Sequence, residues 1–426
     1  MVHSVGMNSG IPRQRIAVIG SGIAGLGALY LLSPHHDVTL FEADQRVGGH
    51  THTHRVERWG QTFHVDSGFI VHNPENYPLF TRLLNRLGVG SRATTMSFAV
   101  SNARTGLEYN ATNLDSLFCQ RRNLVSPRFL GMLRDLGRFY REAPGVLERG
   151  DLRSVGAYLA DERYGDAFRD DHLAPMASAL WSCPSGQALE LPMAFLVRFM
   201  ANHHMLSFTG RPTWRVVEGG SHSYVKAILA RSSATVHTQT PVLRVSRGAE
   251  GVTVTSKRGD ERFDEIVIAC HSDQALALLA DPSEQERALL GAIPYIENDV
   301  ALHHDASLLP RTAKATAAWN ALVPREPGDA CTVSYGMHLL QGIASPEPFV
   351  VTLNRTDAVD PSKLVARMRY HHPRFTRESV AASERLAVLD EGRHTHYAGA
   401  YFGFGFHEDG FRSAVKVAAR LGGRFA

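Results

Sequence analysis

Cysteine is scarce in this sequence. The 426 residues include four cysteines, at positions 119, 183, 270 and 331, and none forms a Cys-x-x-Cys pair. This scarcity argues against a disulfide framework and a zinc knuckle, and it fits a reducing, cytoplasmic compartment. Residues 1–15 also lack the apolar core of a signal peptide, in agreement with that location.

A large excess of either charge is absent as well. Lysine and arginine number 45 against 42 aspartates and glutamates, so the net charge is +3 at pH 7. A nucleic-acid-binding face needs a denser basic patch, and no nucleic-acid partner is expected. With 44% hydrophobic and 20% charged residues the chain is not disordered, and its length predicts two domains.

One uncharged run approaches the length of a membrane span. Residues 16–32 continue for 17 positions without a charge, at the short limit for crossing a bilayer. The run contains four glycines, however, and their order indicates a different structure. A β-branched strand at 15–19 leads into Gly-x-Gly-x-x-Gly at 20–25, a helix at 26–32 and a second strand at 37–41.

This order of elements is typical of a dinucleotide-binding unit. Its first glycine permits a tight turn, the second lets the backbone approach a pyrophosphate, and the third lets helix and strand pack closely. The helix N-terminus attracts the phosphates. An acid about 20 residues later binds a ribose hydroxyl, and Glu42 follows Gly20 by 22 residues. The predicted cofactor contacts are Gly20, Ser21, Gly22, Ile23, Ala24, Gly25 and Glu42.

Residues 42–51 extend this motif. They resemble the E-x-x-x-R-x-G-G-R sequence of the FAD-dependent amine oxidoreductase superfamily, which includes monoamine oxidases, protoporphyrinogen oxidase and phytoene desaturases. His50 stands where that superfamily usually has arginine, and it can neutralise a phosphate only when protonated. The resemblance implies FAD as cofactor, with contacts from Glu42, Ala43, Arg46, Gly48, Gly49, His50 and Thr51.

Two further segments narrow the resemblance. Residues 63–73 resemble a bacterial subgroup associated with cyclopropane-, methyl- and furan-fatty-acid synthesis, which implies cofactor contacts from Asp66, Ser67, Gly68 and Phe69. Residues 397–410 resemble the superfamily's C-terminal flavin motif, which implies contacts from Gly399, His407, Glu408, Asp409 and Gly410. Glu408 and Asp409 also suit a helix cap. Because no cysteine follows Cys331, the resemblance implies non-covalent FAD.

The middle of the chain completes the predicted organisation. Strands are expected at 236–245, 252–257 and 263–269, and the resemblance places Val242 against the adenine. The resemblance implies an α/β fold, with a Rossmann-type FAD-binding domain and a mixed α+β substrate domain, as in monoamine oxidase. The predicted FAD-binding domain is discontinuous, comprising 12–85, 212–275 and 390–426. The predicted substrate domain comprises 86–211 and 276–389.

Two patterns in these segments have open interpretations. Residues 114–143 hold six arginines among apolar residues and fit either a basic stretch on the inner membrane face or a helix with one buried and one solvated side. The 22 histidines raise the hypothesis of a metal site. His50, His52 and His54 are expected on one face of a strand, and His394 and His396 on one face of another. No convergent set of three or four ligands stands out, so no metal is predicted.

The resemblance implies dehydrogenation of a methyl-branched or related fatty acyl chain, with hydride transfer to flavin N5. The Met- and Phe-rich residues 195–208 would then line an apolar tunnel, although such a helix is more often core. His72 and Tyr401 are the catalytic candidates. One alternative is an amine oxidase, for which Tyr397 or Tyr401 supplies part of an aromatic cage. Another is a non-catalytic flavin protein that partners a lipid methyltransferase.

Overall fold

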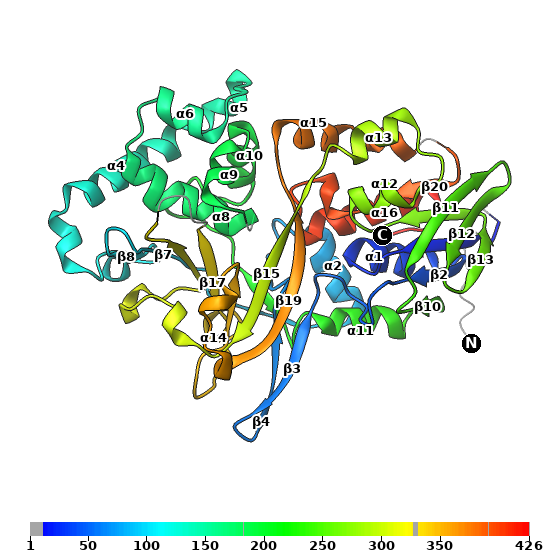
Figure 1. Ribbon diagram of the computed structural model, residues 1–426, viewed down its shortest axis with the longest axis horizontal. Coiled ribbons are helices and arrows are strands. Elements are labelled where there is room, and N and C mark those ends of the chain that lie inside the picture. The colour runs from blue at the N-terminus through cyan, green and yellow to red at the C-terminus, as the bar shows by residue number, and fades with distance from the viewer. Residues whose placement is uncertain (1–11, 182, 327–330, 391, 426) are drawn as a thin grey trace, which may run out of the picture.

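The computed structural model describes residues 12–181, 183–326, 331–390 and 392–425 (Figure 1). The prediction that no signal peptide is present rests on residues 1–15 and therefore lies largely outside the described residues. Within the described residues, no helix is both long enough and apolar enough to span a bilayer.

A five-stranded parallel sheet forms the centre of one half of the molecule. Its order is β10-β2-β1-β14-β20, and every neighbouring pair is parallel. The strands are β1 (Arg15–Ile19), β2 (Asp37–Phe41), β10 (Thr235–His237), β14 (Glu265–Ile268) and β20 (Thr395–Tyr397). Three distant parts of the chain therefore build one sheet. This arrangement confirms the predicted α/β fold with a Rossmann-type sheet.

Alternate side chains of β1 serve two different cores. Ile16 and Val18 pack among the helices α1 (Ile23–Leu32), α2 (Pro78–Leu87), α11 (His222–Ala230) and α16 (His407–Arg420). Ala17 and Ile19 point the other way, toward the antiparallel meander β11 (Val242–Gly248), β12 (Gly251–Ser256) and β13 (Gly259–Phe263). The two-residue period of a strand thus buries β1 on both faces, which explains why residues 16–19 are all apolar.

A larger sheet forms the other half. Its seven strands follow the order β19-β15-β18-β17-β16-β7-β8. Long β15 and β19 cross the middle of the molecule, and a group of helices from α4 (Pro127–Glu142) to α10 (Met193–Asn202) lies beyond the opposite end of the sheet (Figure 1). The strands are β7 (Phe98–Asn102), β8 (Leu107–Asn110), β15 (Tyr295–His303), β16 (Trp319–Val323), β17 (Thr332–Gly336), β18 (Val350–Leu353) and β19 (Leu364–Pro373).

Smaller elements connect the two halves. The hairpin of β3 (Thr53–Arg58) and β4 (Gln61–Asp66) projects from the molecule (Figure 1). A three-stranded sheet joins β5 (Val71–His72), β9 (Arg215–Val217) and β6 (Ser91–Ala93). The helices α12 (Ser272–Leu278), α13 (Glu284–Leu290) and α15 (Arg377–Arg385) belong to the predicted substrate segments or border them. Residues of all three pack in the core of the parallel sheet. The domain boundaries stay predictions.

Three local predictions were wrong. The strand expected at 236–245 is two strands, β10 and β11, because Gln239 has a left-handed φ of 50° and Pro241 has no amide hydrogen to donate. The strand expected at 263–269 is divided at Asp264 between β13 and β14. Residues 114–143 form α3 (Leu114–Leu117), the 3-10 helix η1 (Arg121–Val125) and α4 (Pro127–Glu142), since Pro127 favours a helix start.

One of the two predictions that histidines share a strand face was wrong. His50 lies in a turn before β3, so it does not share a strand face with His52 and His54. His394 and His396 do lie together, and both contact Glu265. Among the described residues, no cluster of three or more His, Cys, Asp or Glu side chains has the geometry of a metal site.

Candidate active site

The loop between β1 and α1 leaves a space beside Gly22. Gly22 has an ordinary φ of −64°, and a Cβ built on it would meet no protein atom within 4 Å. Gly22 is also the N-cap of α1, and no side chain caps the free amides there. Neither backbone strain nor a protein contact explains this glycine, whereas an approaching phosphate does.

Backbone conformation and close protein contacts explain the other two glycines of the motif. Gly20 has a φ of +93°, in the region that favours glycine. A Cβ on Gly25 would lie 1.9 Å from the carbonyl oxygen of Gly20. Ser21, Ile23 and Ala24 are buried around the start of α1. The loop therefore has the shape that the sequence predicted.

Glu42 holds this loop from the end of β2. The Ser21 amide donates to Glu42 Oε2 at 2.9 Å, and the Ser21 hydroxyl donates to the same oxygen. The Asp44 amide donates to Glu42 Oε1 at 2.8 Å. Ala43 lies exposed between these residues. Glu42 thus has a structural task, and its contact with a ribose stays a prediction.

The second glycine loop lies directly on the first. Gly49 is so near Gly22 that a Cβ on Gly49 would lie 3.0 Å from the Gly22 Cα. The Gly48 amide donates to the Ser21 hydroxyl oxygen at 3.0 Å. Arg46 donates to the carbonyls of Thr51 (2.8 Å) and Gly49 (2.7 Å). The arginine therefore fixes the loop that was predicted to reach the pyrophosphate.

His50 occupies an aromatic and histidine-rich cluster. Its ring centroid lies 5.0 Å from that of Tyr370, 5.2 Å from His372 and 6.2 Å from His271. Burial, together with the charge that His271 would add, lowers the pKa of His50 to about 4. Its buried Nε2 has no partner among the described residues. At neutral pH His50 can therefore offer a hydrogen bond to a phosphate but no positive charge.

Three predicted contacts from distant segments meet at the start of α16. The His407 ring stacks on Phe69, with centroids 3.6 Å apart and planes within 9°. His407 Nε2 lies 3.0 Å from Thr51 Oγ1 and 3.1 Å from the Tyr224 hydroxyl. The sequence analysis missed Tyr224, although it lies in the first turn of α11, which follows the Gly219-Gly220 pair.

The predicted carboxylates are held by donors from the protein. Asp66 accepts from the Ser221 amide (3.0 Å), the Ser221 hydroxyl (2.8 Å), Gln341 Nε2 (2.9 Å) and the Thr53 hydroxyl. Burial raises the pKa of Asp66 to about 6. These bonds join the end of β4 to the start of α11. The adjacent Gly68 lies against His50, because a Cβ there would be 2.0 Å from the His50 carbonyl oxygen.

Glu408 and Asp409 act as caps. Glu408 accepts from the amides of Leu79 (3.1 Å) and Phe80 (3.0 Å) at the start of α2, a neighbouring helix. Asp409 accepts from the amides of Phe404 (3.0 Å) and Phe406 (3.2 Å). Burial raises the pKa of both carboxyls. The capping interpretation left open above therefore has direct structural support, and a cofactor contact from either side chain stays a prediction.

The remaining predicted contacts lie in tightly packed positions. A Cβ on Gly410 would lie 2.8 Å from Ile23, so this glycine lets α16 approach α1. The Gly399 amide donates to the Ser413 hydroxyl at 2.9 Å. Val242 is buried in the core below the parallel sheet.

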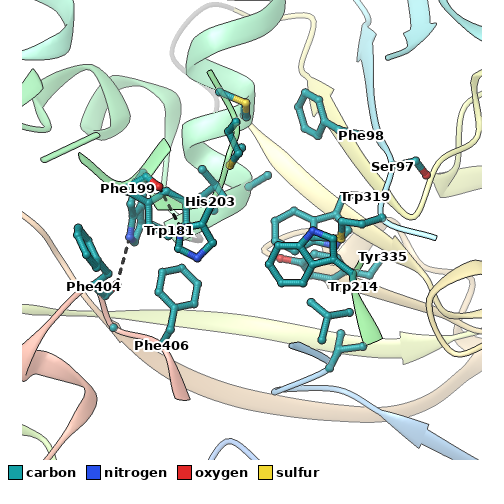
Figure 2. Close-up of a pocket in the computed structure, with 18 of the residues that line it drawn as sticks. Ser97, Phe98, Trp181, Phe199, His203, Trp214, Trp319, Tyr335, Phe404 and Phe406 are labelled. Atoms are coloured by element: carbon teal, nitrogen blue, oxygen red, sulfur yellow. Dashed lines mark hydrogen bonds between the residues drawn. The ribbon is translucent and has the colours of Figure 1, made fainter. Parts of the chain in front are cut away.

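A cavity of about 610 Å³ begins at these segments and extends to the seven-stranded sheet (Figure 2). His50, Ser67, Gly68, Phe69 and His407 line one end. Helices α4, α8 (Ala174–Trp181) and α10 (Met193–Asn202) contribute other walls. Aromatic side chains dominate the lining, and they include Phe98, Tyr140, Trp181, Phe199, Phe208, Trp214, Trp319, Tyr335, Phe404 and Phe406.

The cavity contains little charge. Among the described residues that line it, none is Asp, Glu or Lys, and Arg211 is the one arginine. Arg211 is exposed and follows Phe208, whose side chain is 66% exposed. This end of the cavity therefore has both an apolar and a cationic group at the surface.

His203 is a polar group among these aromatics that the sequence analysis missed. Its Nδ1–H donates to the Phe199 carbonyl at 3.0 Å, and its ring stacks 4.0 Å from that of Phe199 (Figure 2). Fixing the proton on Nδ1 leaves Nε2 as an acceptor. Burial lowers the pKa of His203, which keeps the ring neutral. The sequence signalled it only as one of an adjacent histidine pair.

The catalytic candidates from the sequence lie elsewhere. His72 is fully buried against Phe80 and does not line the cavity. Tyr401 is buried in the core below the parallel sheet. The Tyr397 hydroxyl donates to Glu286 at 2.7 Å, on the same side of the sheet. None of the three is placed to contact a molecule in the cavity.

Comparison with known proteins identifies the family. Residues 23–300 match the family described as flavin containing amine oxidoreductase. The chain belongs to this family. The family places it among FAD-dependent oxidoreductases. A curated relative, AofH of Mycobacterium tuberculosis, is named as a flavin-containing monoamine oxidase. It is 27% identical over 284 residues, which cover 63% of this chain and 59% of AofH. The chain thus spans about three fifths of that relative's length.

Solved structures share the fold. A fatty acid isomerase from P. acnes, titled as producing CLA, matches with a TM-score of 0.68 and 17% identity over 96% of this chain and 98% of its own. Cyclohexylamine oxidase from Brevibacterium oxydans matches with a TM-score of 0.67 and 17% identity over 96% and 99%. At these identities the likeness concerns the fold alone.

The residues present fit FAD. The space beside Gly22 adjoins uncapped helix amides, where a pyrophosphate is stabilised. The orphaned Nε2 of His50 lies on the neighbouring loop. The residues that would hold the cofactor are therefore those of the two glycine loops, with Glu42, His50 and the start of α16.

Proposed function

We propose that the chain is an FAD-dependent dehydrogenase that desaturates a methyl-branched or related fatty acyl chain. The observation that carries the proposal is the cavity lining, which is mostly aromatic and aliphatic and has no acid or lysine among its described residues. Its volume of about 610 Å³ is typical of a site for a small lipophilic molecule.

The lining favours an acyl chain on energetic grounds. Each CH₂ group moved from water into an apolar cavity contributes about 0.8 kcal/mol. An alkylammonium ion would enter the same cavity without an acidic partner, at a cost of several kcal/mol. Arg211 at the exposed end suits an anionic head group rather than a cation.

The chemistry divides between cofactor and protein. When bound, FAD supplies the acceptor for the hydride that leaves one carbon of the substrate. We assign to His203 Nε2, which lines the cavity, the proton that leaves the adjacent carbon, so that a C=C bond forms in place of two C–H bonds. Trp181 supports this wall, because its Nε1–H donates to the Phe404 carbonyl at 3.4 Å (Figure 2).

The fatty acid isomerase among the similar structures supports the proposal to a limited extent. That enzyme acts on a fatty acid, so this fold accommodates such a substrate in another protein. The subgroup resemblance at residues 63–73 adds the methyl-branched substrate class.

Amine oxidation is the second candidate. The names of AofH and of cyclohexylamine oxidase favour it. The positions of Tyr397 and Tyr401 weaken it, since neither lines the cavity and so neither supplies the aromatic cage that the resemblance implied. The third interpretation, a flavin protein that assists a lipid methyltransferase without turnover, predicts that no substrate reduces the flavin.

Anaerobic flavin reduction tests these candidates. The holoenzyme is mixed with methyl-branched fatty acids, with phospholipids that carry them, and with a panel of primary amines and polyamines. We expect loss of the oxidised flavin absorbance with an acyl substrate and none with amines. Reduction by amines alone would establish amine oxidation, and reduction by neither class would favour the non-catalytic role.

A further inference from the structure

A second, smaller cavity lies at the start of α4, away from the aromatic cavity. Its volume is about 340 Å³, and it is lined by Thr105, Leu107, Arg122, Asn123, Ser126, Arg128 and Phe129. These residues come from the turn between β7 and β8, from η1 and from the first turn of α4. Two arginines thus face one small space, which favours an anion as its ligand. The start of α4 adds little, because the Phe129 amide already donates to the Ser126 hydroxyl.

Two polar groups in this cavity, Asn123 and Arg122, have no charged partner among the described residues. Asn123 is 4% exposed, and its Nδ2 has no hydrogen-bond partner among the described residues. Arg122 donates to the Gly106 carbonyl at 2.6 Å and forms no ion pair among those residues. Arg128 is paired with Asp171 at 2.7 Å. A buried amide donor without an acceptor is costly, so Asn123 independently indicates a ligand that supplies a hydrogen-bond acceptor.

Exposed apolar side chains lie on η1 and α4, which contribute lining residues to this cavity, and on α3, the helix before them. Leu124 and Val125 of η1 are 50% and 79% exposed, Leu130 of α4 is 44% exposed, and Leu114 of α3 is 75% exposed. Arg134 lies one turn beyond Leu130 on the same exposed face of α4, and its side chain is 78% exposed. Large apolar groups interspersed with arginines are typical of a surface that enters the headgroup region of an anionic membrane.

The same helix forms a wall of the aromatic cavity. Leu133, Leu136 and Tyr140 of α4 line that cavity. By the helical period they lie on a face next to the one that carries Leu130 and Arg134. A membrane bound at the exposed face would therefore lie beside the proposed substrate cavity.

We propose that η1 and the first turn of α4 bind the phosphate of an anionic phospholipid headgroup and so dock the protein on a membrane. Arg122 and Asn123 receive the phosphate, while Leu124, Val125 and Leu130 enter the interface. The link to substrate delivery rests on the proposed function, but the docking surface itself does not.

Vesicle sedimentation tests the surface on the oxidised holoenzyme, without turnover. The vesicles are phosphatidylcholine alone, or two parts phosphatidylcholine to one part phosphatidylglycerol. We expect binding to the mixed vesicles, little binding to phosphatidylcholine, and weakening by added salt. Arg122→Ala should reduce binding about fivefold and Arg122→Lys much less. The double variant Leu124→Ser, Val125→Ser should reduce it at least about tenfold.

A matched control uses Arg149 and Leu152, two exposed residues that do not line the small cavity. Arg149 is exposed and Leu152 is 67% exposed, so Arg149→Ala with Leu152→Ser removes the same kinds of group away from the cavity. Flavin content and melting temperature show whether each variant folds. Equal binding to both vesicle types, or unchanged binding in Arg122→Ala, would overturn the proposal. Binding of free inorganic phosphate without vesicle binding would also overturn it, in favour of a soluble ligand. Flavin reduction is not measured here, so failure of the proposed function leaves this result unaffected.

Discussion

Gly22 is the residue at which the protein leaves space for something other than itself. A methyl group there meets no protein atom within 4 Å, and the backbone angles suit any residue. We therefore expect Gly22→Ala to cost the unliganded fold no more than about 1 kcal/mol, the usual penalty of an alanine N-cap. FAD should nevertheless be lost, because the methyl group would occupy the position of the pyrophosphate.

The measurement compares the flavin-to-protein ratio with the melting temperature of the flavin-free form. Gly131→Ala on α4 is the control, since a Cβ there also meets no atom within 4 Å but lies far along the chain from both loops. It should retain flavin. If Gly22→Ala binds FAD as well as the wild type does, the assignment of this loop to the pyrophosphate is wrong.

A second prediction for a single residue concerns His203. His203→Asn removes the acceptor Nε2 and should lower the rate of anaerobic flavin reduction by about 10²- to 10⁴-fold, with unchanged flavin content. His204→Asn is the control, because His204 is adjacent and half exposed. Asparagine also tolerates its φ of 52°. Equal rates in the two variants would exclude His203 as the proton acceptor.

The pH dependence of the rate follows from the same side chain. Burial lowers the pKa of His203, so the acceptor form persists below the usual pKa of histidine. The reduction rate should stay constant through neutral pH and fall only below about pH 6.5. In His203→Asn this acid limb should disappear.

Among the elements, the first turn of α16 holds together parts of the fold that are distant in sequence. Glu408 is 3% exposed and caps α2 with both oxygens. Glu408→Ala would leave two backbone amides without an acceptor, and we expect the free energy of unfolding to fall by about 1–3 kcal/mol in urea titrations. Glu378→Ala, in the exposed first turn of α15, should change it by less than about 0.5 kcal/mol. A loss of flavin affinity without destabilisation would instead support the predicted cofactor contact of Glu408.

The elements predicted from the sequence can be compared with those in the structure. The β1, Gly20–Gly25, α1, β2 and Glu42 series was predictable, because each part rests on local backbone chemistry. The divisions at Gln239 and Asp264 were missed, because apolar residues stand on both sides of each, although Pro241 is a signal against one continuous strand. His203 and Tyr224 were also missed, because their importance comes from contacts with Phe199 and His407 that no local pattern encodes.

At the scale of the molecule, acid sensitivity should follow from buried histidines. His72, His172, His303 and His304 are at most 4% exposed, and burial lowers the pKa of each to about 4. Between about pH 6.5 and pH 4 the unfolded chain binds more protons than the folded one. Stability should therefore be full above about pH 6.5 and decline below it, by up to about 1.4 kcal/mol per pH unit for each histidine.

Urea midpoints measured from about pH 7.5 to pH 4.5 check this expectation. In His72→Phe the decline should be shallower by about one proton, because phenylalanine keeps the contact with Phe80 but cannot titrate. A urea midpoint that does not change with pH across this range would contradict the histidine explanation.

The division of the parallel sheet among distant segments has a consequence during synthesis. The neighbouring strands β1 and β2 are complete once residue 41 has been made, but β20 begins only at residue 395. At about 5–20 residues per second, a ribosome needs roughly 20 to 70 s to cover that interval. Until then the site at which β20 pairs with β14 stays open, and α16 cannot pack on α1. The nascent chain therefore exposes an unpaired strand edge and the apolar surface around Gly27, where Phe411 later packs, and both are targets for chaperones.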